Sequence, residues 1–402
     1  MHINLDYKKC CGCNACIATC PVNAIVQQKD ELGFSYPIVD EEKCIQCSKC
    51  IKACQMDAIV YPETYEYEYY AGQSKDEEIL KVSSSGGIFD ALARQILSCG
   101  GTVYGAGFDE AWNVVHSRAT NLQELTAFYG SKYVQSDNVK VYENLAEDLK
   151  EGRTVLFSGT PCQCQGVKKY VNTMKVNEDK LYLVDFVCHG VASPEIWQKY
   201  IQLLQKERGT IKYYNFRNKD SGWKKYRTSI LNDKGEEISD NKYKYFDLYS
   251  SLLSTRSSCF NCDFTTYNRA SDITLGDFWN IDKLENNLNL EAGVSQILIN
   301  SSKGKCLFEE IKESIEYLQC TQKDCWQPHL EYPVEQPRGR DKFISFYRNN
   351  EFDKVMAKYG RGTFVGKCKK VMMPIVKKLG LYVIAGKIYN FVFGNSRKKN
   401  KA

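Results

Sequence analysis

Along residues 81–335, apolar residues recur with two different periods, in some stretches that of a strand and in others that of a helix. SSSGGIFDALARQIL has a Ser cap and helical apolar spacing, which predicts a helix over about residues 87–97. Strands are predicted for four apolar or alternating stretches, the last two of them buried: TVYGAGF (102–108), NVVHSRAT (113–120), TVLFSGTP (154–161) and LYLVDFVCHG (181–190). Helices are expected after both buried strands, which is an α/β pattern.

An aromatic, strand-rich tract follows from Ile211 to Asp277, with a turn at Asp233-Lys234-Gly235. The stretch QILINSSKGKCLFEEIKESI (296–315) then returns to the α/β pattern. No run reaches the roughly 18 apolar residues that a membrane-spanning helix needs. A spanning segment is therefore not expected.

The first sixty residues contain an internal repeat. CCGCNACIATCPVNAIV (10–26) and CIQCSKCIKACQMDAIV (44–60) share their cysteine spacing and the apolar residues that follow, which predicts a pseudo-symmetric unit. A short hairpin is expected between them, over Gln27–Asp40 around Leu32-Gly33. We take residues 1–62 as one domain and the Tyr- and Glu-rich residues 63–80 as a linker.

Length and composition support a multidomain globular protein. At 402 residues the chain is long enough for two or three domains, and 43% hydrophobic with 26% charged residues is ordinary globular composition. We expect an α/β (α+β) protein in which the N-terminal domain precedes a larger domain at 81–335, itself divided into 81–150 and 151–335.

The net charge of +5 conceals a basic tail. Gly366–Ala402 has ten Lys or Arg and no acid, and the remaining chain has 44 basic against 49 acidic residues. The body therefore has no nucleic-acid footprint, and no nucleic-acid partner is expected. Within the basic amphipathic region 336–402, the tail is expected to form two helices divided by Pro374. They either contact a membrane surface or an acidic partner, or pack on the body through Leu381, Ile384 and Ile388.

Nineteen cysteines are the strongest chemical signal. Most fall in tight groups, and the N-terminus lacks the apolar region and cleavage site of a secretion signal, so we expect a reducing cytoplasm. The first group reproduces the C-x2-C-x2-C-x3-C-P run of two-cluster ferredoxins, in which the fourth cysteine binds the other cluster. By this crossed pattern, one 4Fe-4S cluster takes Cys10, Cys13, Cys16 and Cys54, and the other takes Cys44, Cys47, Cys50 and Cys20.

Two features of this module are open. Gln55 stands where the second proline of the pattern is expected, and Cys11 is a spare cysteine with no assigned role. Paired zinc sites are the alternative to clusters, because C-x2-C pairs also bind zinc.

A further set of cysteines lies in the larger domain. Cys162 (SGTPCQ) and Cys188 (DFVCHG) end apolar strands, where α/β sheets place ligand sites, and Cys259 and Cys262 form a pair in SSCFNCDF. The alternative is that Cys162 and Cys188 are small buried hydrophobic residues.

The motifs SSSGGIFDALA, GSKY, SGTPCQ, CHGVAS, CFNCDF and SDITLGDFW, in this order behind a two-cluster ferredoxin module, resemble the coenzyme F420 hydrogenase/dehydrogenase beta-subunit family. The resemblance covers about residues 10–299. It implies a large domain that binds FAD and one 4Fe-4S cluster, with Cys162, Cys188, Cys259 and Cys262 as that cluster's ligands. Cys164, two residues from Cys162, is a competing ligand.

The resemblance also places a flavin site. Its cofactor-binding residues would be Ser84, Ser85, Gly86, Gly87, Gly130, Ser131, Lys132 and Tyr133, the first four at a glycine-rich helix start that admits phosphate oxygens. Taken alone, that start is an ordinary helix cap, and Lys132 an ordinary solvated lysine. Catalytic candidates are Lys132, His189 and Asp277. The alternatives are a structural hydrogen bond for His189, and a turn-capping role for Asp277 with Trp279 in the core.

Clusters carry single electrons and a flavin can deliver two as a hydride, so we expect an iron-sulfur flavoprotein oxidoreductase. It would pass electrons between a ferredoxin or partner subunit and a small acceptor such as coenzyme F420 or another conjugated substrate. An electron-transfer adaptor without its own substrate is the second hypothesis, and a zinc-binding interaction module is the third. The expected location is cytoplasmic, with the tail as the one candidate for contact at the inner face of the membrane.

Overall fold

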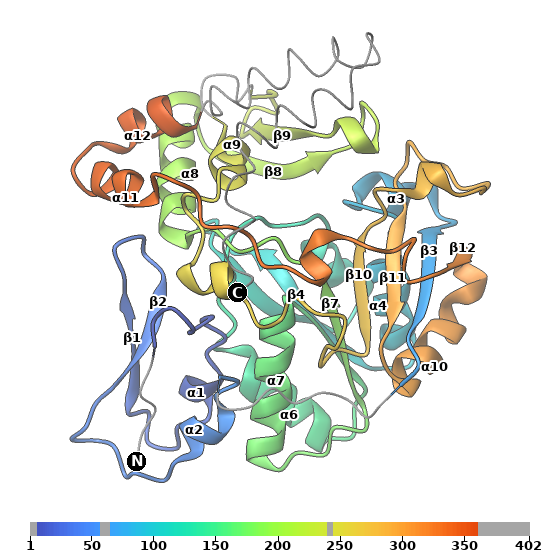
Figure 1. The fold of residues 1–402 in the computed structure, drawn as a ribbon, viewed down its shortest axis with the longest axis horizontal. Helices are drawn as coiled ribbons and strands as arrows, with labels where there is room; N and C mark the ends of the chain where they lie inside the picture. The colour runs from blue at the N-terminus through green and yellow to red at the C-terminus, as the bar shows by residue number, and fades with distance from the viewer. Residues whose placement is uncertain (1–5, 57–64, 239–243, 361–402) are drawn as a thin grey trace, which may run out of the picture.

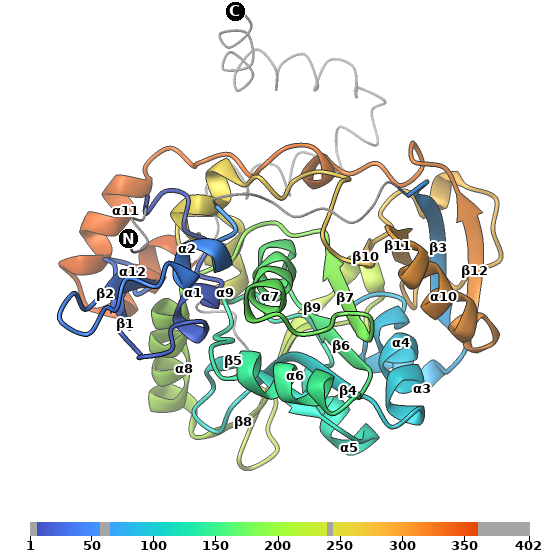
Figure 2. The same ribbon diagram turned by 90° about the horizontal axis from the view of Figure 1, so that it is seen from below.

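The computed structural model describes residues 6–56, 65–238 and 244–360. A large mixed sheet occupies the centre of the molecule, and the N-terminal module lies against one side of it (Figures 1 and 2). Residues 194–232, 245–250 and 340–359 form a further layer of helices and strands that packs on both. The predicted tail helices at 366–402 fall outside the described residues. Within these residues, no helix combines the length and apolar character needed to cross a membrane.

The N-terminal module is built from two similar halves. It contains α1 (Ala15–Ala18), β1 (Ile25–Lys29), β2 (Ser35–Val39) and α2 (Lys49–Ala53), and β1 pairs with β2 antiparallel. The expected hairpin is therefore present. The two helices begin after equivalent left-handed residues, Asn14 at φ 63° and Ser48 at φ 61°, as the repeat predicts. Gly12 and Gln46, two residues earlier in each half, also have positive φ.

The central sheet has the strand order β12-β3-β11-β10-β7-β6-β4-β5. The strands β10, β7, β6 and β4 run parallel, and the strands outside them are antiparallel. Their bounds are β3 (Glu68–Ser74), β4 (Thr102–Phe108), β5 (Val114–Ala119), β6 (Val155–Ser158), β7 (Leu181–Phe186), β10 (Ile273–Asp277), β11 (Ser295–Ile299) and β12 (Ile315–Cys320). All four strands predicted from the apolar stretches are confirmed.

Helices cover both faces of the sheet, which makes the fold mixed α/β (Figure 2). Those packed around the sheet are α3 (Glu77–Val82), α4 (Ile88–Ser98), α5 (Leu122–Leu125), α6 (Val141–Lys150), α7 (Pro161–Met174) and α10 (Ser302–Ile311). The predicted helix near 87–97 is thus α4. A capping box fixes the start of α7, where Thr160 and Gln163 each bond the other's backbone and Pro161 occupies the first turn.

The predicted linker at 63–80 is wrong for most of its length. Residues 68–74 form β3, which pairs with β11 and β12 inside the central sheet, and α3 follows. The Tyr and Glu residues look polar along the sequence. In the structure the Tyr70 ring packs on Phe308 at 4.5 Å, and Lys305 forms an ion pair with Glu68. Partners more than 200 residues away therefore convert this tract into a strand.

An aromatic core lies between the sheet and the N-terminal hairpin. It joins the buried side chains of α8 (Pro194–Arg208), β8 (Ile211–Asn218), β9 (Arg227–Asn232), α9 (Tyr245–Ser250), α11 (Arg340–Arg348) and α12 (Phe352–Tyr359). Trp197 is fully buried there and is surrounded by Tyr214, Phe216 and Tyr245 at 4.8–5.2 Å. Leu32, Phe34 and Tyr36 of the hairpin belong to the same core, so the N-terminal module packs firmly on the rest of the chain.

Candidate functional site

The first N-terminal cysteine set is gathered at the end of the module that faces the sheet. Burial, and then the charges of Cys10, Cys54 and Cys50, raise the pKa of Cys16, which places these thiols around one another. Cys54 comes from the second half of the module, as the crossed pattern requires. Cys10, Cys16 and Cys54 of the predicted set therefore lie near one another, with Cys50 of the other set also close, and the division of the eight cysteines between two clusters stays a prediction.

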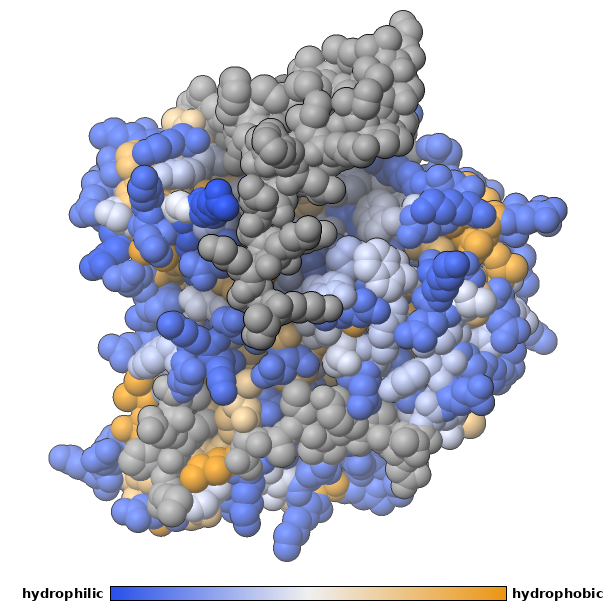
Figure 3. Space-filling view, in the orientation of Figure 1, coloured by the Kyte–Doolittle hydropathy of each residue, from blue (hydrophilic) through white to orange (hydrophobic). Residues whose placement is uncertain are grey.

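The second N-terminal set lines a small cavity at the other pole. Its lining includes Cys20, Cys44, Cys47 and Cys50, together with apolar side chains of β1 and β2. Cys47 is exposed and Ile45 beside it is 60% exposed, so this pole faces outward. Hydrophobic surface is visible over the module in Figure 3.

A cavity of about 350 Å³ opens at the carboxyl ends of β6, β7 and β10. Segments 158–163, 185–191 and 275–279 form its walls, together with 83–90 and 128–136 from the other side. Ligands of open α/β sheets bind at this edge. The volume lies in the range of small-molecule sites.

Cys162, Cys188, Cys259 and Cys262 all line this cavity. Burial, and then the charges of the other three, raise the pKa of Cys188, and burial raises the pKa of Cys259 and Cys262 to about 12. Thiolates at this place require a compensating cation, which iron would supply. The donor set, four thiols in one cavity, fits a 4Fe-4S cluster.

In the described ranges, no three His, Cys, Asp or Glu side chains converge closely enough to hold a single metal ion. A cubane cluster takes one thiolate at each of its four irons, so its ligands stand further apart than those of one ion.

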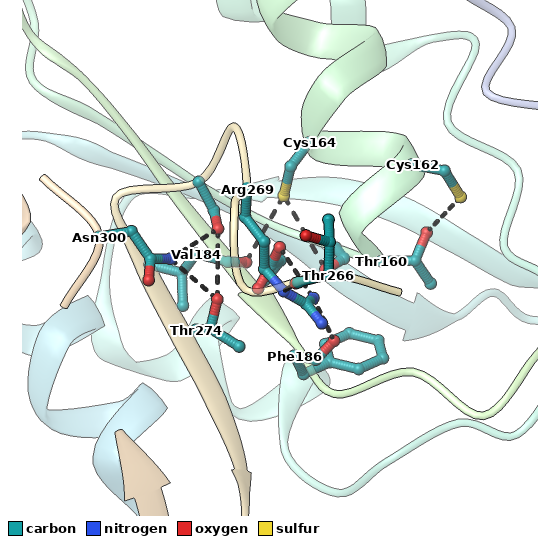
Figure 4. Close-up of polar contacts among 12 residues, drawn as sticks. Thr160, Cys162, Cys164, Val184, Phe186, Thr266, Arg269, Thr274 and Asn300 are labelled. Carbon is teal, nitrogen blue, oxygen red and sulfur yellow. Dashed lines mark hydrogen bonds and ion pairs between the residues drawn. The ribbon is translucent and has the colours of Figure 1, made fainter. Parts of the chain in front are cut away.

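Cys162 and Cys164 leave α7 on different sides (Figure 4). Cys162 Sγ lies 3.1 Å from Thr160 Oγ1 and lines the cavity, whereas Cys164 is fully buried and points back to the sheet. Its Sγ lies 3.7 Å from the Val184 carbonyl oxygen and 3.9 Å from that of Gly159. The geometry thus favours Cys162 over Cys164 as the ligand.

Cys11, which had no role in the sequence prediction, lies between two cysteine sets. The Gln55 side-chain amide donates a hydrogen bond to Cys11 Sγ, and Cys11 lines the large cavity. Hydrogen bonding to Cys13 is the largest cause of its raised pKa, and Cys162 also lies in hydrogen-bonding range. The departure from proline at Gln55 was the only sequence signal of this contact.

The two predicted flavin segments meet at the cavity. Ser84, Ser85 and Gly87 line it on one side, and Gly130, Ser131, Lys132 and Tyr133 continue the same wall. The Ser131 amide donates to Ser84 Oγ at 2.8 Å, which ties the segments together.

Gly86 is not among the lining residues. A Cβ there would lie 2.4 Å from the Gly72 carbonyl oxygen and 2.7 Å from the Ser295 amide nitrogen. The glycine is needed for this loop to approach β3 and β11, and its predicted contact with flavin phosphate remains a prediction.

Lys132 is directed inward. Its Nζ donates to the carbonyl oxygens of Ala127 at 3.0 Å and Tyr129 at 2.9 Å, so it is not a solvated lysine. Burial lowers the pKa of Lys132 to about 7. An anionic group in the cavity would stabilise its charged form.

Asp277 does not cap a turn. Arg217 Nη1 lies 2.6 Å from Asp277 Oδ2, and Trp223 Nε1 donates to Asp277 Oδ1 at 3.3 Å. The Arg217 guanidinium lies 4.4 Å from the Tyr226 ring centroid, and Trp279, which is 36% exposed, stacks on Trp223 at 5.1 Å. Trp279 is therefore at the cavity rim rather than in the core. Arg217 was missed, because its strand-rich surroundings carry no motif.

His189 lines the cavity next to Cys188, with its ring 4.5 Å from that of His329. Burial, and then His329, lower the pKa of His189 to about 4. Its imidazole is therefore neutral near pH 7, which suits a hydrogen-bonding role better than that of a cationic acid.

Three family models match the chain. The 4Fe-4S dicluster domain matches residues 9–59. The N-terminal model of the coenzyme F420 hydrogenase/dehydrogenase beta subunit matches 69–143, and the C-terminal model of the same subunit matches 152–323. The last two adjoin the large cavity from both sides.

No curated protein matches the chain. Among solved structures, the chain is similar to one from the F420-reducing [NiFe] hydrogenase complex of Methanosarcina barkeri. The sequences are 17% identical, the match covers 75% of this chain and 93% of the other, and the TM-score is 0.40.

Proposed function

The chain belongs to the coenzyme F420 hydrogenase/dehydrogenase beta-subunit family, and from this premise we propose that it is an iron-sulfur flavoprotein oxidoreductase. It would take single electrons from a reduced ferredoxin or a partner subunit and reduce a small conjugated acceptor, such as coenzyme F420, at FAD. One observation carries the proposal. The four cysteines of the large domain and both predicted flavin segments line one cavity, which also reaches the N-terminal module at Cys11.

The three cysteine sets lie in an order suited to electron transfer. The second N-terminal set, Cys20, Cys44, Cys47 and Cys50, lines the outward pole. The first set, predicted as Cys10, Cys13, Cys16 and Cys54, would lie at the inward pole, and the third set lines the cavity. We infer that an electron donor docks at the outward pole, where Cys47 and Ile45 are exposed. The module and the large domain are joined at the inward pole, where Tyr142 donates to the Cys13 carbonyl oxygen and Asn14 Nδ2 donates to Asn138 Oδ1 at 3.2 Å.

The cavity fits an anionic cofactor. Bound clusters pass one electron at a time, whereas a bound flavin can collect two and deliver them as a hydride. Lys132 would hold a flavin phosphate or the negative charge of the reduced ring, because burial otherwise disfavours its ammonium. Gly130 (φ 76°) and Gly87 (φ 78°) give the adjoining loops conformations that other residues rarely adopt.

The adaptor hypothesis is the less favoured alternative. Besides the segments assigned to the third cluster and the flavin, the cavity is lined by the Arg217–Asp277 pair and by Trp279, which is 36% exposed. These polar and aromatic groups at an open rim favour an enzyme with its own substrate over an adaptor.

The test is anaerobic purification of the full chain, followed by iron, sulfide and flavin analysis. We expect about twelve iron atoms and one non-covalent FAD per chain, four irons for each cluster. Reduced ferredoxin should then bleach the flavin absorbance, and added acceptors, with coenzyme F420 first, should restore it. Iron without flavin would overturn the oxidoreductase proposal in favour of the adaptor. Zinc in place of iron would overturn both.

A further inference from the structure

Arg256 connects the cysteine loops of the large domain to the N-terminal module. Its backbone belongs to the large domain, since its amide donates to the Val191 carbonyl oxygen at 3.0 Å and its carbonyl accepts from the Cys259 amide at 3.0 Å. Its side chain is 1% exposed and extends into the module. One residue thus touches the surroundings of two predicted clusters.

The Arg256 guanidinium is held in a fixed orientation against the Cys10 loop. Nε donates to the Cys10 carbonyl oxygen at 2.9 Å, Nη2 donates to the Ser35 carbonyl oxygen at 3.0 Å, and Nη1 donates to Gln135 Oε1 at 3.0 Å. The ring centroids of Tyr36 and Phe34 lie 4.2 and 5.3 Å from its Cζ.

The chain at Gly12 is shaped around this guanidinium. Gly12 has φ 70°, and a Cβ there would lie 2.8 Å from Arg256 Nη1. Only glycine allows the loop to pass so close in this conformation.

A buried arginine is always charged, and it is costly without an anion beside it. The hydrogen-bonding partners of Arg256 are two carbonyls, a side-chain amide and a thiol, with Nη2 3.7 Å from Cys10 Sγ. The Cys10 thiolate, when bound to iron, would therefore place a negative charge beside the guanidinium.

We propose that Arg256 is the counter-charge of the cluster expected at Cys10, Cys13, Cys16 and Cys54, and that it raises the reduction potential of this cluster. This inference rests on the proposed function, because it requires that the N-terminal clusters are present. Each added electron makes a cluster more negative, so a fixed positive charge and a hydrogen bond to a ligand sulfur stabilise the reduced form.

The consequence concerns the middle of the expected electron path. Electrons that enter at the outward pole would reach the large cavity through the cluster beside Arg256, and the guanidinium would stabilise the reduced form of that cluster. Arg256 is on this account a positioning residue for electron transfer and does not contact substrate.

The experiment is a redox titration of the full chain followed by EPR under anaerobic conditions. In Arg256→Met, the midpoint potential of one N-terminal cluster should fall while iron content stays at the wild-type value. Arg256→Lys keeps the charge, so its potential should remain near that of the wild type. Unchanged potentials in an iron-replete Arg256→Met protein would overturn the proposal.

A matched control is Arg348→Met, which removes a 57% exposed arginine that pairs with Glu31 of the same module. This charge is screened by solvent, and no potential should move. If Arg256→Met fails to retain iron, Gln135→Glu replaces it, because a carboxylate beside Nη1 neutralises the guanidinium without removing it. An iron-replete Gln135→Glu protein with wild-type potentials would equally overturn the inference.

Missing flavin or about eight irons would contradict the proposed function and leave the N-terminal clusters measurable. Their potentials are read from their own EPR signals, so the effect of Arg256 is tested independently.

Discussion

Gln55 donates its side-chain amide to Cys11 Sγ, although the two residues stand 44 positions apart and in opposite halves of the repeat. Gln55 follows Cys54, and Cys11 lies between Cys10 and Cys13, so the bond links both segments expected to hold the inward cluster. Gln55 is 1% exposed and its Oε1 has no partner among the described residues. The substitution of the expected proline therefore has a structural purpose at the junction between module and cavity.

Cys11 contacts the ligand sets without belonging to one. We predict that Cys11→Ala retains about twelve iron atoms per chain, because three complete sets of four cysteines remain. Iron and sulfide analysis of the anaerobic protein measures this. A fall to about eight irons would show that Cys11 is itself a ligand and that one of the three sets of four is wrongly assigned.

Cys162 and Cys164 provide a matched pair of variants on one helix. Cys162→Ala should lower the iron content from about twelve to about eight and slow flavin reduction, while the EPR signals of the N-terminal clusters persist. Cys164→Ala should keep all the iron, because this thiol packs against Gly159 and Val184 away from the cavity. The opposite outcome would exchange their roles.

The local parts of the fold were predictable, and the contacts between distant parts were not. The cysteine spacing, α4, and the strands β4 to β7 follow from short-range pattern alone. The sequence predicts a linker in place of β3 because the Tyr and Glu residues of this strand have partners on distant elements, among them Tyr317 of β12 and Lys305 of α10. Strand propensity depends on such neighbours.

The same limit applies to the site. Cys162 and Cys188 could be placed because parallel strands bring their carboxyl ends to one edge, but Arg217 and Arg256 carry no motif. Each can be recognised only in the structure, where its guanidinium is buried. Arg217 lies beside Asp277, and Arg256 lies beside Cys10.

Removal of one partner of the Arg217–Asp277 pair should destabilise the protein. Asp277→Asn leaves the guanidinium, whose side chain is 3% exposed, without its counter-ion, and this should cost on the order of 3 kcal/mol in the free energy of unfolding. Urea denaturation of the anaerobic protein measures the change. The comparison is Lys224→Met, which breaks an exposed pair with Asp282 and should cost about 1 kcal/mol or less. Equal effects would mean that the buried pair is not energetically special.

His116 should make the protein sensitive to mild acid. Its ring is 5% exposed, stacks on Phe157 at 5.0 Å, and has Nε2 3.0 Å from the Ser158 carbonyl oxygen. Nε2 therefore donates, and the buried Nδ1 has no partner among the described residues. Burial lowers the pKa of His116 to about 4, and the neighbouring Lys132 acts in the same direction.

The sign of the pH effect follows from these pKa values. The unfolded chain binds a proton at His116 near pH 6.5, whereas the folded protein does so only near pH 4, so stability is lost as the pH falls through this window. At pH 5.5 the loss relative to pH 7.5 should be about 1 kcal/mol. His116→Gln cannot titrate but keeps a donor for Ser158, so its stability should fall less over the same interval. Phe157→Leu, which weakens the same packing without removing the imidazole, should lower stability at both pH values while keeping the wild-type pH dependence. Parallel pH curves for the wild type and His116→Gln would mean that His116 takes up its proton equally in both states.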